Sequence, residues 1–288
     1  MHRGGTLAVA LTALLPASFA GWLVWDTAQK PVSRPAAAAS PSGVVASPTA
    51  ARAAAPKATP SLARPLAGKV IVIDPGHNPN NRKHTAQINR LVNIGTGRKA
   101  CDTTGTATNK GYAEASFTLD VARRARAILE KLGATVKLTQ NGDRAYGPCV
   151  DERARIGNNA HADAAISIHA DGAPSGDRGF HIILPASVHK GIADTRAIVK
   201  PSRTLGMDVR AAFKAATKTS YANYINGGKG YDVRSDLGGL NVSRVPKVFI
   251  ECANMRDAKD AAEVTSAAWR QRAAQGVANG LAAFLEGK

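Results

Sequence analysis

Aromatic residues are scarce in this chain of 288 residues: Phe, Trp and Tyr together make up 5% of it. Aromatic residues interleaved with runs of Lys and Arg are typical of nucleic-acid binding. The few aromatic residues of this chain do not show that pattern. The chain is nevertheless basic, with 38 Lys and Arg against 21 Asp and Glu and a net charge of +17. We therefore expect no nucleic acid partner. The charge suits either an anionic polymer or membrane surface, or simply a solvated basic surface.

Two further patterns are absent. No internal repeat is evident, and no short metal-binding signature such as H-E-x-x-H occurs. Any metal site must therefore be assembled from residues that lie far apart in the sequence. Cysteine is rare too, and three residues of this type leave at least one unpaired.

The longest apolar stretch, Leu7 to Trp25, follows a short basic start and carries no charge. Ser18-Phe19-Ala20 fits a cleavage site for export. The apolar run continues beyond it, however, and nearly reaches the length needed to span a bilayer. We predict that residues 1–26 are a signal peptide or an N-terminal membrane anchor, and that the protein is exported to the periplasm or cell envelope, or secreted.

Residues 27–66 are rich in Ala, Pro and Ser, and seven of the fifteen prolines fall between Pro31 and Pro65. This composition lacks apolar periodicity, so we predict a disordered linker. The folded part is then a single domain over residues 67–288, and the protein is expected to be a monomer.

From Gly68 onward, short apolar segments alternate with amphipathic ones. The predicted strands are Val70–Asp74, Thr135–Thr139, Ala164–His169, Gly179–Leu184 and Lys247–Glu251, and the predicted helices are Ala113–Leu132, Asp151–Ala160, Arg203–Lys218 and Val264–Leu285. Strands interleaved with helices predict an α/β domain with a largely parallel sheet.

Three of these strands end on side chains capable of metal binding or proton transfer. The segment VIVIDPGH places His77 just past a buried strand, AAISIHAD ends near His169, and KVFIE ends on Glu251. Ligand and catalytic sites of open α/β sheets gather at the carboxyl ends of the strands. We therefore expect one shared site at this edge of the sheet.

Zinc favours histidine nitrogen and carboxylate oxygen ligands and keeps one position open in catalytic sites. His77 and His169 supply two such ligands, and Glu114, at the start of a predicted helix, supplies a third. Glu114 alone would equally suit a carboxylate that stabilises a helix N-terminus. Glu251 then remains as the group that takes a proton from water. The other histidines are expected to be structural or exposed, although His181 lies in a strand near the site.

The segments VIVIDPGH, the Glu114 helix start, ADAAISIHAD and VPKVFIECANMRDAKDA together resemble the zinc-dependent N-acetylmuramoyl-L-alanine amidases of bacterial cell-wall remodelling. The resemblance spans about Gly68 to Leu285. It implies a single α/β domain with a mixed, twisted sheet flanked by helices. It also implies one Zn²⁺ per chain, held by His77, Glu114 and His169, with Glu251 catalytic.

The resemblance further implies hydrolysis of the amide between N-acetylmuramic acid and L-alanine, with peptidoglycan or muropeptides as substrate. Two alternatives remain open at this point. A zinc peptidase acting within the stem peptide would use the same four residues, and a non-catalytic wall-binding or regulatory module would need none of them intact.

Cys101 and Cys149 both lie in Gly-rich loops near the predicted site, whereas Cys252 follows Glu251 in a buried strand. Because export permits oxidation, we predict a Cys101–Cys149 disulfide. The long polar stretch 78–113 between two proposed ligands is predicted to lack regular structure. It forms either one wall of the cleft or a surface insertion.

Overall fold

The computed structural model describes residues 64–287. The predicted signal or anchor segment and nearly all of the predicted linker lie outside the described residues. Leu66, the last residue of the predicted linker, has 0% of its surface exposed and belongs to the main core. Its backbone N–H donates to Leu132 O at 3.0 Å. The folded part therefore begins before residue 67, the boundary predicted from composition.

A six-stranded sheet runs through the centre of the folded unit, in the order β4-β1-β5-β10-β6-β9. Neighbouring strands are parallel except for β10 and β6, which run antiparallel. The six strands are β1 (Val70–Pro75), β4 (Thr135–Leu138), β5 (Ala164–Asp171), β6 (His181–Pro185), β9 (Tyr231–Arg234) and β10 (Lys247–Asn254). The predicted α/β fold with a mostly parallel, mixed sheet is confirmed.

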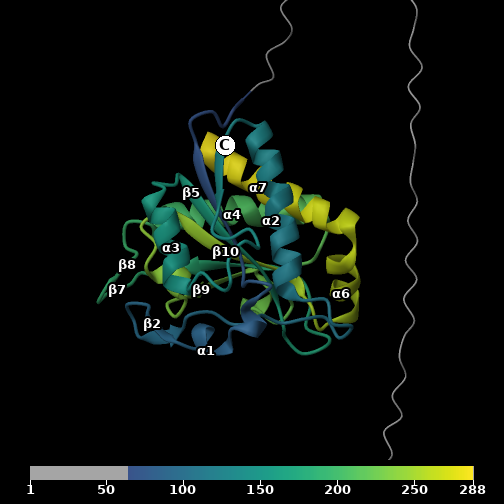
Figure 1. The fold of residues 1–288 in the computed structure, drawn as a ribbon. Helices are drawn as coiled ribbons and strands as arrows, with labels where there is room; N and C mark the ends of the chain where they lie inside the picture. Colours follow the sequence, from purple (N-terminus) through teal and green to yellow (C-terminus); the bar gives the residue numbers. More distant parts are fainter. Residues whose placement is uncertain (1–63, 288) are drawn as a thin grey trace, which may run out of the picture. The chain divides into compact units, whose positions relative to one another are not determined.

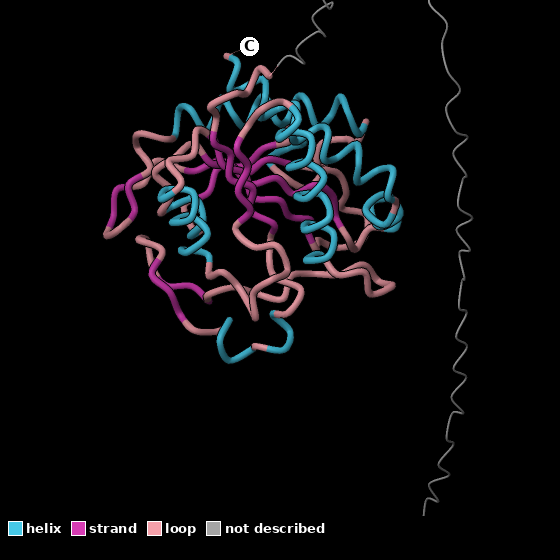
Figure 2. The backbone as a smooth tube through the Cα atoms, turned by 45° about the horizontal axis from the view of Figure 1, so that its top comes forward, coloured by secondary structure: helices cyan, strands magenta, loops and turns pink. Residues whose placement is uncertain are grey.

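Helices cover both faces of this sheet, as Figures 1 and 2 show. On one face lie α2 (Glu114–Lys131), α4 (Val199–Thr217), α6 (Ala258–Thr265) and α7 (Ala267–Glu286). The other face carries α3 (Val150–Asn159), which contacts β1 and the short helix α5 (Gly238–Asn241). Since both faces are covered, the central strands are apolar almost throughout, as expected for buried parallel strands.

The main core lies between the sheet and the layer of α2, α4 and α7. Ile166 and Ile168 of β5 pack there with Leu129 of α2 and Trp269 of α7, all with 0–1% of their surface exposed. On the opposite face, a smaller cluster forms around Val72. Burial on both faces fixes the register of β1 and β5, and so fixes where their carboxyl ends lie.

The stretch 78–113 contains regular structure that the sequence did not predict. It folds into the 3-10 helix η1 (Asn81–Lys83), the helix α1 (Thr85–Ile88) and a hairpin of β2 (Leu91–Asn93) and β3 (Arg98–Ala100). In Figure 1, α1 and β2 lie together at the lower edge of the unit. These elements are three or four residues long, too short for a periodic signal, and they gain stability from a small cluster built around Val92, Ile94 and the two paired cysteines.

Three other expectations need correction. The predicted closing helix is two helices, because Ser266 interrupts it and caps α7 by accepting a hydrogen bond from Trp269 N. Helix α4 begins four residues earlier than predicted, with Pro201 in its first turn, where no intrahelical N–H is required. The edge strand β9, the two-stranded hairpin of β7 (His189–Lys190) and β8 (Ala193–Asp194), the 3-10 helix η2 (Asn226–Gly228) and α5 were not predicted.

Candidate metal centre

His77, Glu114 and His169 converge at the carboxyl end of the parallel strands. His77 lies in the turn after β1, His169 lies near the end of the adjacent strand β5, and Glu114 is the first residue of α2. One ligand atom from each residue lies within 4.8 Å of the other two. The structure thus brings together the three side chains that were predicted as metal ligands.

Two glycines allow the backbone to approach these side chains closely. A Cβ at Gly76 would lie 2.5 Å from His169 Nδ1, and a Cβ at Gly105 would lie 2.7 Å from Glu114 Oε2. His77 itself has a φ of 61°, in the left-handed region that non-glycine residues seldom occupy. Such strain is typical of residues whose side-chain direction matters for function.

Glu114 joins the two histidines. Its Oε2 lies 3.2 Å from His77 Nε2, and its Oε1 lies 3.0 Å from His169 Nδ1. Two backbone N–H groups, of Thr106 and Ala170, also donate to the carboxylate. Burial alone would raise the pKa of Glu114, but the two imidazoles hold it well below its usual range. The carboxylate is therefore ionised and oriented, as a metal ligand must be.

Glu251 enters the same site from β10, the strand next to β5. It is paired in register with His169 on one side and with His181 of β6 on the other. Its Oε2 is buried and has no hydrogen-bond partner among the described residues. Burial, together with the carboxylates of Glu114 and Asp171, raises the pKa of Glu251 well above its usual range. This is the environment of a carboxyl group that exchanges protons.

A buried charge network lies behind the metal ligands, and sequence reasoning assigned it no role. Asp74 accepts hydrogen bonds from Arg153 Nη1 at 2.7 Å and from Lys247 Nζ at 3.3 Å. Arg153 also donates to Asp102 Oδ2 at 2.8 Å. The available signal was a charged residue in each of two otherwise apolar strands, Asp74 near the end of β1 and Lys247 at the start of β10. Nothing in the sequence marked Arg153 or Asp102 as their neighbours.

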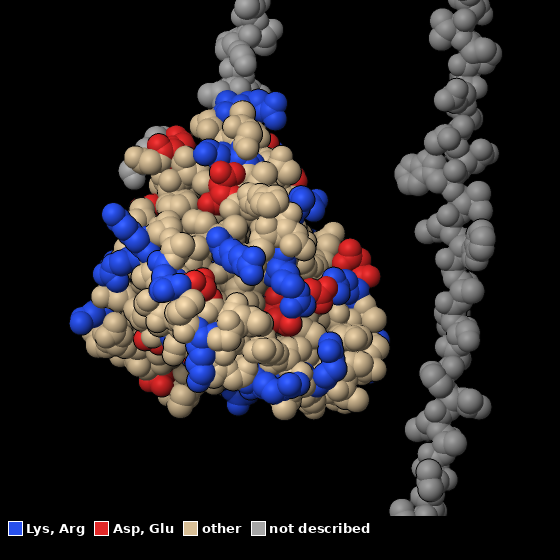
Figure 3. All heavy atoms as spheres, turned by 90° about the vertical axis from the view of Figure 1, so that its left-hand side faces the viewer, with Lys and Arg blue, Asp and Glu red and all other residues tan. Residues whose placement is uncertain are grey.

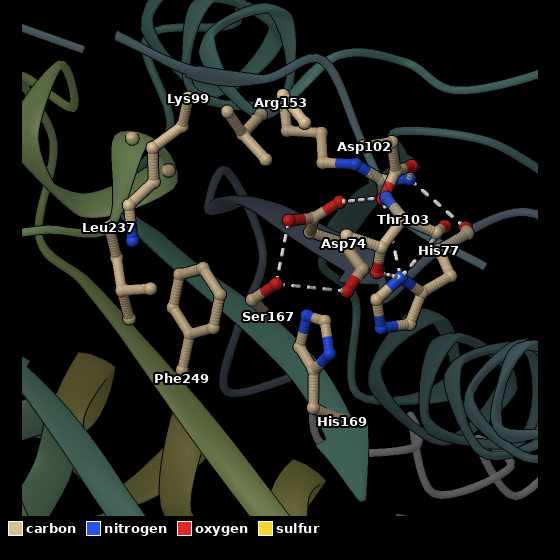
Figure 4. Close-up of a pocket in the computed structure, with 14 residues that line it drawn as sticks. Asp74, His77, Lys99, Asp102, Thr103, Arg153, Ser167, His169, Leu237 and Phe249 are labelled. Carbon is tan, nitrogen blue, oxygen red and sulfur yellow. Dashed lines mark hydrogen bonds and ion pairs between the residues drawn. The ribbon is translucent and has the colours of Figure 1, made fainter. Parts of the chain in front are cut away.

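Two adjoining cavities open onto the centre. The larger, about 470 Å³, is lined by the three ligand candidates and by Glu251. The smaller, about 240 Å³, lies between His77 and His169 on one side and Lys99 and Leu237 on the other, with Phe249 stacked 5.3 Å from the His169 ring (Figure 4). Lys99, Ala100, Asp102 and Thr103 line the smaller cavity, and Thr103, Gly105 and Thr106 line the larger one. Part of the long stretch 78–113 therefore forms a wall of the cleft.

Cys101 and Cys149 are joined by a disulfide, with an S–S distance of 2.03 Å. Cys252 is free and buried within β10. The disulfide connects the segment just after β3 to the residue that precedes α3. It therefore ties the wall of the cleft to the helix that carries Arg153.

Comparison with known proteins decides the family. The family model described as N-acetylmuramoyl-L-alanine amidase matches residues 71–283. The chain belongs to this amidase family. The amidase is 41% identical over 221 residues to N-acetylmuramoyl-L-alanine amidase Rv3717 of Mycobacterium tuberculosis, an alignment that covers 76% of this chain and 88% of that protein.

Solved structures agree with this assignment. The N-acetylmuramyl-L-alanine amidase Ami1 of Mycobacterium smegmatis is 39% identical, with a TM-score of 0.70, and the match covers 77% of this amidase and 99% of that chain. Ami1 of Mycobacterium abscessus gives the same identity and TM-score, over 76% and 100% of the two chains. The amidase is thus an enzyme of the N-acetylmuramoyl-L-alanine amidase type that acts on peptidoglycan, which is consistent with a location in the cell envelope.

Proposed function

We propose that this amidase hydrolyses the bond between N-acetylmuramic acid and L-alanine with one Zn²⁺ per chain, bound by His77, Glu114 and His169. The observation that carries the proposal is the convergence of these three side chains in one cleft with Glu251, whose buried Oε2 has no partner among the described residues. Two imidazoles and a carboxylate fit zinc, and a site with three protein ligands would leave one position for water.

When bound, zinc lowers the pKa of a water molecule and polarises a carbonyl oxygen. Glu251, which lines the same cleft as the ligand candidates, accepts the proton of the attacking water. Its raised pKa lets the carboxyl group hold that proton and then donate it to the departing alanine amine. Asp102 and Glu114 hold the imidazole of His77 in place from its two nitrogens.

The first test is metal analysis of the purified protein. Wild type is expected to carry one zinc per chain, and His169→Ala to carry a small fraction of that amount. His161→Ala removes a histidine that lies outside the cleft and serves as the matched control. Full zinc retention by His169→Ala would show that the ligand set is wrong.

A zinc peptidase acting within the stem peptide remains the second candidate function, because the same four residues suit it. The two differ in the bond that is cut, so mass analysis of products from a defined muropeptide separates them. An amidase releases the intact stem peptide with a free L-alanine amine, whereas a peptidase leaves L-alanine attached to the sugar.

We further propose that the protein is exported and monomeric, with residues 1–26 as a cleaved signal or a membrane anchor. Those residues lie outside the described part of the chain. Within residues 64–287, no helix is long and apolar enough to cross a bilayer. N-terminal sequencing of the mature protein tests cleavage, and a first residue before position 20 in a membrane fraction would favour the anchor.

A further inference from the structure

The imidazole of His77 is held on the side that faces away from the metal ligands. Its Nδ1 lies 3.2 Å from Asp102 Oδ1 and 3.2 Å from the carbonyl oxygen of Thr103. An ionised carboxylate and a carbonyl only accept hydrogen bonds, and the Thr103 hydroxyl, also 3.2 Å from Nδ1, can accept as well; these contacts favour a proton on Nδ1. Nε2 faces the Glu114 carboxylate at 3.2 Å; a metal bound there would replace the proton on Nε2, whereas the proton on Nδ1 would stay with Asp102.

Asp102 is itself fixed from behind by Arg153. Only 4% of the surface of Asp102 is exposed, and its Oδ2 accepts from Arg153 Nη2 at 2.8 Å. The same guanidinium donates to the carbonyl oxygens of Pro75 and His77, in the turn that presents the ligand. One arginine therefore fixes both the backbone of His77 and the carboxylate that orients its ring (Figure 4).

The two cysteines of the disulfide are sequence neighbours of residues that contact Arg153. Cys101 directly precedes Asp102, and Cys149 directly follows Pro148, whose carbonyl oxygen accepts from Arg153 Nε at 2.9 Å. The N–H of Val150 also donates to Cys101 O at 2.7 Å. The covalent bond thus joins the two segments that contact Arg153 from opposite ends of its guanidinium.

We propose that Asp102 is a positioning residue for the metal ligand His77, and that the Cys101–Cys149 disulfide acts through Asp102 to keep that ligand oriented for metal binding. The inference rests on the metal centre proposed above. Groups that hydrogen-bond to metal-ligating histidines commonly change metal affinity by 10- to 100-fold when removed. A disulfide with a purely structural role would change stability and leave metal affinity alone.

The test is a double-mutant cycle on metal affinity. Four full-length proteins are compared: wild type, Asp102→Ala, Cys101→Ser with Cys149→Ser, and all three changes together. The dissociation constant for Zn²⁺ is measured by competition with a chelator of known affinity, and the Tm of each metal-free protein is recorded alongside. Asp194→Ala, which removes an exposed carboxylate far from the centre in sequence, is the matched control.

We expect Asp102→Ala to weaken zinc binding 10- to 100-fold, and Asp102→Asn, which keeps an acceptor oxygen, to weaken it less. Loss of the disulfide is also expected to weaken zinc binding in the presence of Asp102, with little further effect once Asp102 is gone. The fall in Tm caused by losing the disulfide should be similar in both backgrounds.

The proposal is wrong if either change leaves zinc affinity within about twofold of wild type, or if the two effects multiply in the triple variant. Wild-type protein whose disulfide has been reduced, with the reductant then removed, gives the same comparison should the serine variant fail to fold. If wild type itself binds no zinc, the proposed metal centre fails, a result distinct from failure of the positioning role.

Discussion

Glu114 and Glu251 are both buried glutamates in one cleft, yet their surroundings assign them different roles. Glu114 receives two backbone N–H groups and contacts two imidazoles. Glu251 has a buried oxygen with no partner in the described chain. Accordingly, the pKa is lowered in Glu114 and raised in Glu251. The first is suited to bind a metal ion as an anion, and the second to gain and lose a proton.

This contrast predicts a separation of metal binding from turnover. Glu251→Gln keeps the size of the side chain but cannot accept a proton, so we expect full zinc content with turnover reduced at least 100-fold. Glu114→Gln should lose both zinc and turnover. Metal analysis and a muropeptide assay on the same preparations check this. Near-wild-type turnover by Glu251→Gln would show that another group is the base.

The buried side chain of His181 is expected to make the stability of the protein depend on pH. Only 3% of its surface is exposed and its Nδ1 has no partner among the described residues; burial lowers its pKa to about 4. Because the folded-state pKa lies below the ordinary value of about 6.5, the unfolded chain binds the proton more readily. Keeping His181 neutral therefore costs the folded protein no stability above about pH 6.5. As the pH falls from there toward about 4, the free energy of unfolding decreases, because the unfolded chain gains a proton at His181 that the folded protein does not.

The matching experiment compares wild type with His181→Phe, which keeps a ring but cannot titrate. Between pH 7.5 and pH 5, the free energy of unfolding of wild type should fall by about 2 kcal/mol more than that of the variant. Denaturant titrations at several pH values measure this difference, with exposed His189→Phe as the control. Equal pH dependence in wild type and His181→Phe would contradict the assignment.

His77 and His169 were predictable as ligand candidates because strands of buried residues ended on or just before them, and parallel strands share an edge; Glu114 was predictable only as the carboxylate at a helix start. The roles of Asp102 and Arg153 were not predictable. The two side chains bond to each other across more than 50 positions, and each lies in a segment of ordinary polar sequence. Their roles depend on tertiary packing, which a local pattern does not encode.

At the scale of elements, the long helix α2 was predicted well, whereas the short elements α1, β2 and β3 were missed. Helix α2 was expected within one or two residues of its observed bounds, because its apolar face repeats over five turns. The β2–β3 hairpin and α1 have too few residues for any period to show. Their stability comes from the disulfide and from contacts with distant segments, including a hydrogen bond from Asn241 to Ile94 O at 3.2 Å.

The packing of α4 against α7 gives a prediction at this scale. A Cβ at Gly276 of α7 would lie 2.7 Å from Phe213 Cα, and Gly280 meets the backbone of Val209 in the same way. In contrast, a Cβ at Gly157 of α3 would lie 3.6 Å from its nearest neighbour, an ordinary contact. Alanine raises helix propensity at each position. The sign of the change in the free energy of unfolding therefore depends on whether there is space for the added Cβ.

We expect Gly276→Ala to lower the free energy of unfolding by about 1–3 kcal/mol, because the backbone of α4 cannot yield as a side chain would. Gly157→Ala should raise it by about 0.5–1 kcal/mol through the gain in helix propensity. Denaturant unfolding measures both. The account of this interface is wrong if the two substitutions have the same sign.

At the scale of the whole molecule, charge is the dominant feature. The chain carries a net charge of +17, and Lys and Arg outnumber Asp and Glu on the face shown in Figure 3. If this charge serves to hold the enzyme on an anionic wall, added salt should weaken that attraction, since the Debye length shortens to about 10 Å at 0.1 M and about 3 Å at 1 M.

We therefore expect turnover on intact wall bearing anionic polymers to fall several-fold between 0.05 M and 0.5 M salt. Turnover on a small soluble muropeptide should change by less than a factor of two, because it needs no long-range attraction. Initial rates on the two substrates, measured side by side, check this. A parallel decline on both would indicate a salt effect on the catalytic domain itself.

We propose that a metal bound by His77, Glu114 and His169 enables this family member to release stem peptides from muramic acid. Digestion of purified peptidoglycan, with products identified by mass, tests it most directly when run with untreated, chelator-treated and zinc-restored enzyme. We expect free stem peptides with an N-terminal L-alanine from untreated enzyme, none after chelation, and recovery of their release with one equivalent of zinc. Undiminished release after complete removal of the metal would contradict it.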